Sequence, residues 1–283
     1  MLHRIWLGVP LFMALMLGGC VIRVQGAAQG KAQAQGASAT KNSATPVRTC
    51  PDLDPNTTVT YDFNALSEGK LDGQDGWTLV HGNSPMQLAR GKGFDGSMAA
   101  VFMNYGQIVR KNSGAFSVPK ISGNETTLAI EYDTLFAGYI VGGTSEFMLV
   151  SAATMTGDLA STSTSPWIGV KEGHLNYRQS SFGEQIPAPV PSDVKPGHWI
   201  RLRLVIDLTD KREGKNGSAT VFLKNLTKED KVFRSIPRLD NLDAHLERAS
   251  TPPATWDAMY VRFDKPADYR IDNLRVSPAA NCR

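Results

Sequence analysis

The chain has 283 residues, of which 41% are hydrophobic and 20% are charged, and its formal net charge is +3. This composition is typical of a soluble globular protein, not of a disordered chain or a multi-span membrane protein. The charge is small and scattered, and its densest cluster, Asp210–Lys215, alternates in sign. We therefore expect no nucleic-acid partner.

The N-terminus has the pattern of a secretory signal. His3 and Arg4 precede an apolar run from Ile5 to Leu17, which is too short for a stable membrane span. Cleavage of a plain signal peptide further on, within Val24–Gly30, is one interpretation. It places the protein outside the cytosol and leaves no membrane attachment.

The other interpretation is a lipoprotein, because "LGGC" (Leu17–Cys20) resembles the bacterial lipobox. The resemblance implies that residues 1–19 are removed and that Cys20 is lipidated, which anchors the protein to a membrane. Val21 after the cysteine fits sorting to the outer membrane of a bacterial cell envelope. Residues 20–49 are rich in Ala, Gln, Gly, Ser and Thr, so we predict a flexible tether there.

Cys50 and Cys282 are the other two cysteines of the chain. With Cys20 acylated, they form an even pair in an oxidising compartment, which predicts a disulfide; two free thiols are the alternative. The bridge would close almost the whole domain, for which the chain-entropy model gives roughly 4–5 kcal/mol.

From Val59 onward, short apolar runs alternate with turns rich in Gly, Asn, Asp and Pro. Many runs have period two, which predicts strands with one buried face. We predict one all-β domain over residues 50–283, an antiparallel β-sandwich. Its strands cover Val59–Phe63, Met86–Arg90, Met98–Asn104, Gly106–Lys111, Thr127–Phe136, Glu146–Ala152, Trp167–Gly173, His174–Gln179, His198–Leu208, Ser218–Leu226, Trp256–Phe263 and Tyr269–Val276.

One segment, Pro237–Ser250, has a different period. Leu239, Leu242 and Leu246 have helical spacing with charges between them. We predict one short helix near residues 238–249, covering an edge of the sandwich.

Three stretches resemble the concanavalin A-like lectin/glucanase domains of the laminin-G-like style. They are "YDFNALSEGKLDGQDGW" (Tyr61–Trp77), the hairpin Gly197–Thr227 and the closing "YRIDNLRV" (Tyr269–Val276). The resemblance spans most of Val59–Val276. It implies a jelly roll and leaves the function open.

Glucanases of this superfamily carry carboxylates on alternate residues of one strand, where they act as nucleophile and general acid. Here Glu131 and Asp133 match this pattern, but Leu135 stands where the second glutamate belongs. Glu131 and Asp133 are therefore only weak catalytic candidates, and the alternative is an acidic strand face without catalysis. The chain contains neither a G-x-S-x-G elbow nor an H-E-x-x-H zinc motif.

Exposed aromatic side chains hold sugars in lectin-like domains, and polar groups beside them take the hydroxyls. The candidates are Trp167, Tyr177 and Tyr105, with Arg178 as a polar contact. The alternative for each aromatic residue is packing in the sandwich.

The resemblance also implies a structural calcium ion between the first and last strands. Asp62 and Asp272 are the candidate ligands, although family members often carry Glu where this chain has Asn64. The alternative is hydrogen bonding of both carboxylates to turn backbone. No other cofactor is required.

These patterns lead to one functional hypothesis and two alternatives. The hypothesis is a lipid-anchored, non-catalytic protein of the bacterial envelope that binds a polysaccharide or other glycan. The alternatives are a glycoside hydrolase or polysaccharide lyase, and an assembly lipoprotein with a protein partner.

Overall fold

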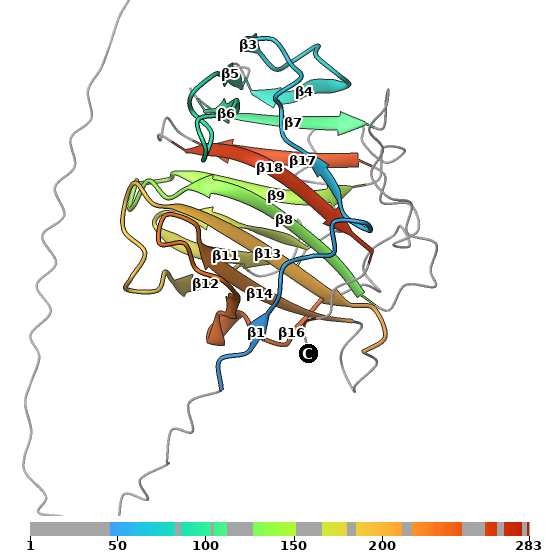
Figure 1. Cartoon of the computed structure of the whole chain (residues 1–283), viewed down its shortest axis with the longest axis vertical. Coiled ribbons are helices and arrows are strands. Elements are labelled where there is room, and N and C mark those ends of the chain that lie inside the picture. Colours follow the sequence, from blue (N-terminus) through green and yellow to red (C-terminus); the bar gives the residue numbers. More distant parts are fainter. Residues whose placement is uncertain are drawn as a thin grey trace, which may run out of the picture. The chain divides into compact units, whose positions relative to one another are not determined.

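The computed structural model describes residues 46–82, 86–102, 105–111, 127–150, 166–179, 185–210, 217–244, 258–264 and 269–278, together with residue 282. All of them belong to one compact unit, Ala44–Arg283. Strands dominate this unit (Figure 1). Among the described residues, no helix has the length and apolar character needed to span a bilayer.

Two antiparallel sheets form the unit, and we call them sheet A and sheet B. Sheet A has the order β1-β15-β14-β13-β8-β18-β6-β5-β3, with β16 paired to β14 and β2 paired to β18. Its strands are β1 (Thr49–Cys50), β2 (Val59–Tyr61), β3 (Gly69–Lys70), β5 (Gln87–Ala89), β6 (Ala99–Val101), β8 (Thr127–Leu135), β13 (Trp199–Asp207), β14 (Ser218–Asn225), β15 (Phe233–Ser235), β16 (Leu242–Asp243) and β18 (Arg270–Ser277).

Sheet B has the order β12-β11-β10-β9-β17-β7-β4. Its strands are β4 (Trp77–Gly82), β7 (Gly106–Lys111), β9 (Thr144–Val150), β10 (Trp167–Lys171), β11 (His174–Arg178), β12 (Gln185–Pro189) and β17 (Ala258–Asp264).

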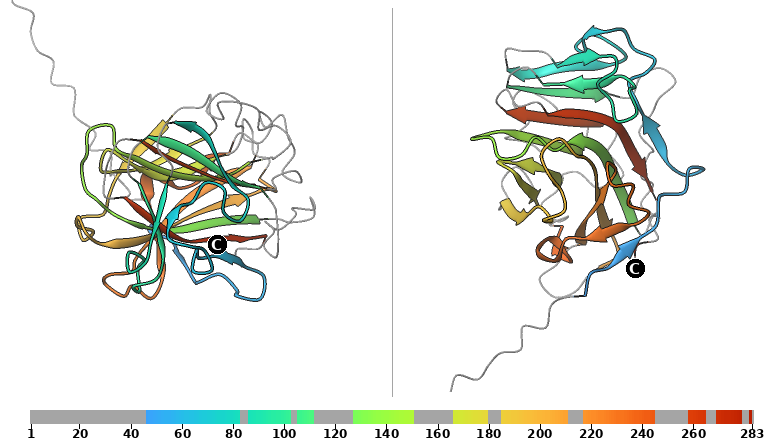
Figure 2. Two further views of the ribbon diagram at one scale, coloured as in Figure 1. Left: turned by 90° about the horizontal axis from the view of Figure 1, so that it is seen from above. Right: turned by 60° about the vertical axis from the view of Figure 1, so that its left-hand side comes forward.

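The chain passes repeatedly from one sheet to the other, for example from β6 to β7, from β8 to β9 and from β17 to β18. The two sheets lie face to face in all three ribbon views (Figures 1 and 2). This is a jelly-roll sandwich, so the predicted fold class is confirmed.

The core between the sheets follows the predicted period of two. In β13, Leu202 and Leu204 are fully buried in the main hydrophobic cluster, and they meet Ile168 and Val170 of sheet B there. Burying one such side chain contributes roughly 1.5–3 kcal/mol. The intervening residues of each strand point to the outward face of its sheet, away from this core.

The stretch Tyr61–Trp77 is folded by contacts among its own polar groups. The Trp77 indole donates to the Tyr61 hydroxyl (3.0 Å), which in turn donates to Asp75 (2.9 Å). Arg110 of β7 pairs with the same carboxylate at 3.0 Å. Burial raises the pKa of Tyr61 to about 12, so this hydroxyl remains a donor at neutral pH.

The segment predicted as a helix is mostly extended. A single 3-10 turn, η3 (Pro237–Leu239), is followed by extended Asp240 and then by β16, which pairs with β14. Asn241 takes a left-handed conformation at φ 56°, which ends any helix. The helix predicted near residues 238–249 is thus reduced to one turn in the described part, and residues 245–249 lie outside it.

A disulfide joins Cys50 of β1 to Cys282, as the cysteine count predicts. The two residues are separated by 232 positions, so the bond connects the two ends of the unit. It lies on the outward face of sheet A.

Candidate functional site

Buried charged side chains occur on the outward faces of both sheets, and the two faces differ in how these charges are paired. On sheet A the charged residues are Glu131, Asp133, Arg201, Arg203, Asp272 and Arg275. On sheet B the polar residues are Gln107, Glu146, Lys171, Asn176, Arg178 and Arg262.

On sheet A, cross-strand register brings the two carboxylates of β8 opposite arginines of β13, whereas Asp272 of β18 lies opposite Asp133. Arg201 of β13 lies opposite Asp133 of β8 and binds it through two bonds, of 2.5 and 2.9 Å. Arg203 lies opposite Glu131 and binds it at 3.0 Å. Arg275 adds a second cation at 3.3 Å from Asp133.

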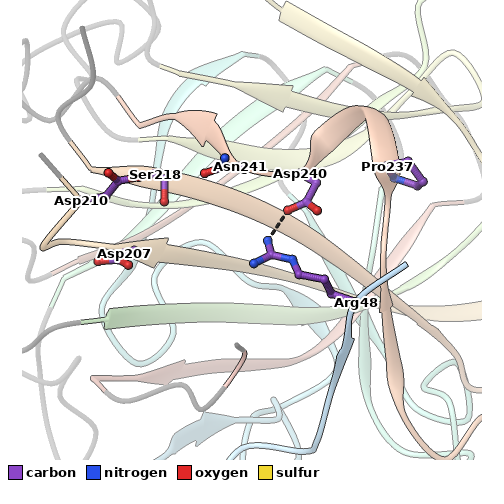
Figure 3. A pocket seen from close by; sticks show the side chains of 7 residues that line it. All are labelled: Arg48, Asp207, Asp210, Ser218, Pro237, Asp240 and Asn241. Carbon is purple, nitrogen blue, oxygen red and sulfur yellow. Dashed lines mark hydrogen bonds and ion pairs between the residues drawn. The ribbon is translucent and has the colours of Figure 1, made fainter. Parts of the chain in front are cut away.

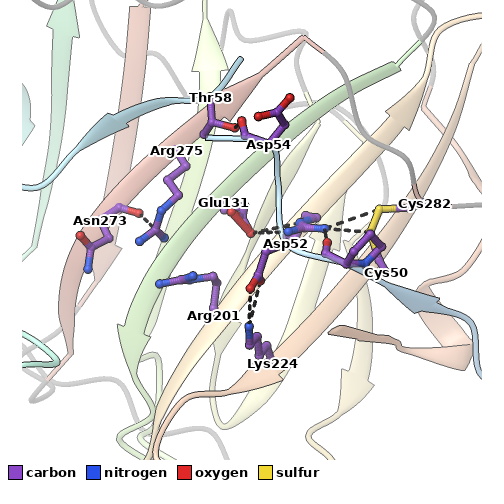
Figure 4. A network of polar contacts seen from close by, with 12 residues as sticks. Cys50, Asp52, Asp54, Thr58, Glu131, Arg201, Lys224, Asn273, Arg275 and Cys282 are labelled. Atoms are coloured by element: carbon purple, nitrogen blue, oxygen red, sulfur yellow. Dashed lines mark hydrogen bonds and ion pairs between the residues drawn. A yellow bond between two sulfur atoms is a disulfide. The ribbon is translucent and has the colours of Figure 1, made fainter. Parts of the chain in front are cut away.

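The segment after β1 covers this network. Arg203 donates to the Pro51 carbonyl oxygen at 2.7 Å, and Lys224 pairs with Asp52 at 2.8 Å. Figure 4 shows Asp52 beside the strands that carry Glu131 and Arg201. Glu131 and Asp133 are both buried, and short bonds to Arg203 and Arg201 already occupy these two weak catalytic candidates. Both serve the ion-pair network instead.

The predicted calcium ligands are engaged in hydrogen bonds. Asp62 is exposed and accepts the backbone N–H of Asn64 at 3.1 Å, which closes a turn. Asp272 is buried and accepts the Ser97 hydroxyl (2.9 Å) and the Asn273 N–H (2.7 Å). Burial raises the pKa of Asp272 to about 6.

Hydrogen-bond donors of the loop at 93–98 lie between Asn64 and Asp272, where the sequence predicts calcium. Ser97 donates to Asp272, and the Met98 N–H donates to the Asn64 side chain at 3.0 Å. Among the described residues no three His, Cys, Asp or Glu side chains gather as a metal site. The described residues thus do not fit calcium with Asp62 and Asp272 as shared ligands, and calcium binding stays a prediction.

Sheet B carries a row of polar residues across its outward face. The register aligns Asn176 of β11, Gly169 of β10, Glu146 of β9, Arg262 of β17 and Gln107 of β7. Side chains of directly paired residues point to the same face of a sheet. The row therefore places an amide, a carboxyl, a guanidinium and a second amide side by side.

Glu146 lies at the centre of the row and is only partly paired. It is 1% exposed, and its Oε1 accepts the Asn176 amide at 2.8 Å. Its Oε2 has no hydrogen-bond partner, and Arg262 stays 3.9 Å away. Desolvation by burial raises the pKa of Glu146 above its usual value, although Arg262 opposes this.

Gly169 makes room for this glutamate. A Cβ at Gly169 would overlap the Ser145 carbonyl oxygen and lie 2.8 Å from Cγ of Glu146. Any larger residue would therefore displace the carboxyl group from the row. No turn requires this glycine, so the close approach of Glu146 explains it.

Two predicted ligand residues, Trp167 and Arg178, lie beside this row. Trp167 is fully buried, with the guanidinium carbons of Arg178 and Arg262 at 5.4 and 5.7 Å from its ring centroid. A ring buried to this extent offers no open face for sugar stacking. Trp167 instead packs with Tyr260 in a small apolar cluster on the outward face.

The remaining two predicted ligand residues lie apart. Tyr177 points into the main core and donates its hydroxyl to the Asp243 carbonyl oxygen at 3.1 Å, so the prediction of an exposed ring is wrong. Tyr105 is half-buried at the other edge of the face, where its hydroxyl accepts the Gln107 amide at 2.8 Å. The structure thus brings Trp167, Arg178 and Tyr105 to one face and excludes Tyr177.

The row opens into a groove at the β12 edge of sheet B, with a volume of about 440 Å³. Its polar contacts are already ordered: Lys171 donates to Gln185 at 2.6 Å, and Asn176 holds Glu146. We call it the β12 groove; Lys171, Glu172, His174, Asn176, Gln185, Pro187, Pro189 and Arg238 line it.

An exposed tyrosine lies next to the turn that contributes Glu172 and His174 to this groove. Tyr139 is 68% exposed, and its backbone packs against Gly173 in the β10–β11 turn. A Cβ at Gly173 would lie 3.0 Å from Cα of Tyr139, and its φ of +74° also favours glycine. The Glu172 carboxylate fixes the same loop by accepting the Gly142 N–H at 2.7 Å.

Sequence reasoning missed Glu146, Asn176, Arg262 and Tyr139. Glu146, Asn176 and Arg262 lie on three different strands, and they share a face only because those strands align in the sheet. The sequence does not reveal that pairing. Tyr139 follows Gly138 in a loop, and exposure there leaves no periodic signal.

Two further depressions both include Pro237 of η3 in their lining. One, of about 730 Å³, is lined by Arg48, Asp207, Asp210, Ser218, Pro237, Asp240 and Asn241 (Figure 3). In it Arg48 pairs with Asp240, as the dashed line in Figure 3 marks. The other, of about 630 Å³, contains Val47, Pro189, Ile236 and Arg238.

Comparison with known proteins gives matches among solved structures alone, since neither a family model nor a curated protein matches. Domain 4 of the GH43 arabinanase AbnA from Geobacillus stearothermophilus, in complex with arabinotriose, is 15% identical with a TM-score of 0.42; the match covers 83% of this chain and 94% of that one. Lectin I-B4 from Griffonia simplicifolia, metal free, is 11% identical with a TM-score of 0.43, over 77% and 98%.

The CBM2 module of the evolved Dit of Lactobacillus casei BL23 phage J-1 is 12% identical with a TM-score of 0.44, over 84% and 97%. All three scores describe a likeness of chain path alone. The strand order of the two sheets establishes the fold, and the site must be interpreted from its own residues.

Proposed function

We propose that this domain binds a saccharide in the β12 groove and along the adjoining row of sheet B. The observation that carries the proposal is the lining of the groove. Amide, ammonium, guanidinium, imidazole and carboxylate groups meet two proline rings there, beside an exposed tyrosine.

Each class of group matches one part of a sugar. Hydroxyl groups both donate and accept, so they pair with the amides of Asn176 and Gln185 and with the charged ends of Lys171 and Glu172. The apolar faces of a sugar ring pack on flat apolar surfaces, which Pro187 and the Tyr139 ring provide. A groove open at the sheet edge admits a chain as well as a single ring.

We further propose that the domain is displayed on a membrane surface through Cys20. The signal-like N-terminus, the Leu17–Cys20 motif and the polar stretch after it support this. Incorporation of labelled palmitate into the full chain, abolished by Cys20→Ala, is the expected result. Unlabelled wild-type protein would contradict lipidation and leave saccharide binding unaffected.

Affinity electrophoresis of the full chain through gels that contain neutral or acidic polysaccharides tests saccharide binding. At least one polysaccharide should retard the protein, and Tyr139→Ala should weaken that retardation about three- to tenfold. Phe94→Ala is the matched control, because Phe94 is also exposed, at 40%, and packs near Trp199 of sheet A. Absence of retardation in every gel, or an equal loss in both variants, would contradict the proposal.

A second candidate function, polysaccharide cleavage, is favoured by Glu146. Burial raises the pKa of this carboxyl, which is the direction that general-acid catalysis requires. Asp264 lies on the same face and contacts the same arginine at 3.6 Å, so it is the candidate second carboxylate. New reducing ends or unsaturated products from the same polysaccharides, lost in Glu146→Gln, would support cleavage; intact polysaccharides would contradict it.

A further inference from the structure

Arg262 differs from the arginines of sheet A in the quality of its ion pairs. Its Nη1 is 3.9 Å from Glu146 and its Nη2 is 3.6 Å from Asp264. Both distances exceed that of a charge-assisted hydrogen bond, which is about 2.7–2.9 Å. The Arg262 Nε is buried and has no hydrogen-bond partner.

The groups around Arg262 also present unused hydrogen-bonding capacity. Glu146 is 1% exposed and its Oε2 is unpaired; Gln107, in the same row, is 1% exposed and its Oε1 is unpaired. The Trp167 indole N–H is fully buried and unpaired. A folded protein leaves few such groups unsatisfied, and several in one row are typical of a site completed by a ligand.

The charge of this row favours an anion. Arg262, Arg178 and Lys171 all act on Glu146 as neighbouring positive charges. Three cations thus surround a single carboxyl group whose ionised form burial disfavours. When it carries a proton, Glu146 can donate from Oε2, alongside the N–H groups of Arg262.

We propose that this row recognises the carboxylate of an acidic saccharide, with Arg262 and Glu146 as the groups that contact it. The inference rests on the saccharide binding proposed above and adds the class of sugar, a uronic acid. The carboxylate accepts from the Arg262 guanidinium and from the Glu146 carboxyl. The remaining hydroxyls of the chain lie toward Asn176 and the β12 groove.

Calorimetric titration of the full chain with an oligogalacturonate and with a neutral cello-oligosaccharide of equal length tests this assignment. The acidic ligand should bind at least about tenfold more tightly, since a hydrogen bond to a charged group contributes about 1.5–3 kcal/mol. Increasing salt should lower the affinity for the acidic ligand and leave the affinity for the neutral ligand unchanged.

Three variants test which side chains cause the preference for the acidic ligand. Arg262→Gln should remove most of the preference for the acidic ligand and leave the affinity for the neutral one within about twofold, and Arg262→Lys should retain part of it. Glu146→Gln should keep or strengthen acidic binding, because glutamine still donates and carries no charge. Arg90→Gln, at an exposed arginine outside the site, is the matched control and should change neither affinity.

The outcomes separate the two proposals. Equal affinity for both ligands, or equal losses of both in Arg262→Gln, would overturn the uronate assignment and leave saccharide binding intact. Preference for a sulfated oligosaccharide over the uronate would also overturn it. Absence of binding by the oligogalacturonate would overturn the uronate assignment, and the electrophoresis described above decides saccharide binding separately.

Discussion

The outward faces of the two sheets carry the same kinds of charged side chain, but they differ in how closely these charges are paired. On sheet A, both oxygens of Asp133 bind Arg201, and Glu131 binds Arg203 at 3.0 Å. On sheet B, one oxygen of Glu146 is unpaired and its nearest cation, Arg262, is 3.9 Å away. The carboxylates of sheet A are occupied by short bonds to arginines. The unpaired oxygen of Glu146 has no such bond and can form one with a ligand.

Register explains the short ion pairs of sheet A. The alternate acids of β8 face the alternate arginines of β13 at the same height, so Glu131 and Asp133 each have a cation directly opposite. Glu146 faces Gly169 on one side, which has no side chain, and Arg262 on the other. A directly opposed pair forms short bonds on sheet A, but the corresponding pair on sheet B stays apart.

The largest expected effect on stability comes from removal of the disulfide on the outward face of sheet A. Cys50→Ser with Cys282→Ser should lower the free energy of unfolding by roughly 4–5 kcal/mol, because the bond closes a loop of 232 residues. Urea denaturation of the variant and of reduced wild-type protein measures this. Midpoints equal to that of the oxidised wild type would show that the bond does not constrain the unfolded chain.

Opening one ion pair of sheet A is the next test. Arg203→Met leaves Glu131 buried without its cation and should cost about 3–5 kcal/mol. The double variant Arg203→Met with Glu131→Leu should recover most of that loss, since no charge is then buried alone. A loss below about 1 kcal/mol in the single variant would show that the face of sheet A is as open as that of sheet B.

Asp272 is the buried carboxyl group of sheet A that lies opposite another carboxylate, Asp133. Burial raises its pKa from 3.8 to about 6. A carboxyl with a raised folded-state pKa destabilises the fold once it ionises, so stability should fall as pH rises from about 4 to about 6. At about 1.4 kcal/mol per unit, the loss approaches about 3 kcal/mol. Asp272→Asn should flatten this dependence, as thermal unfolding from pH 4 to pH 7 would reveal.

The same measurement with calcium tests the metal prediction. Added calcium that restores stability at pH 7 in the wild type, but not in Asp272→Asn, would support a calcium site at the seam. Identical curves with calcium and with a chelator would contradict it.

The smallest effect on stability is expected on the outward face of sheet B. Glu146→Gln removes a charge that burial disfavours, so stability at pH 7 should stay within about 1 kcal/mol of wild type, on the stabilising side. Chemical denaturation at pH 7 measures it. A loss comparable to that of Arg203→Met would indicate that Glu146 is a structural ion-pair residue like Glu131.

Much of the fold could be predicted from the sequence, because its signals are local. Alternation in β13 marked Leu202 and Leu204 as core, and the even pair Cys50 and Cys282 indicated the disulfide. In the described part of the segment predicted as a helix, up to residue 244, only one turn forms, because leucine spacing ignores the left-handed Asn241 and the pairing of β16 with β14.

The site was less accessible to sequence reasoning, because strand pairing determines it. The E-x-D pattern of β8 resembled a catalytic strand until Arg201 and Arg203 were found opposite its acids. Trp167 and Tyr177 have similar aromatic character in sequence, yet they lie on opposite faces of sheet B. Only the paired sheet shows that Glu146 lacks an equivalent closed pair.

Backbone amide chemical shifts of the full chain, recorded during titration with an oligogalacturonate, locate the bound saccharide on one of the two sheets. We expect perturbations in β9, β10, β11 and β17 around Glu146 and the β12 groove, with β8 and β13 unchanged around Glu131 and Arg203. Perturbations centred on β8 and β13, with sheet B unaffected, would contradict the proposed site on sheet B.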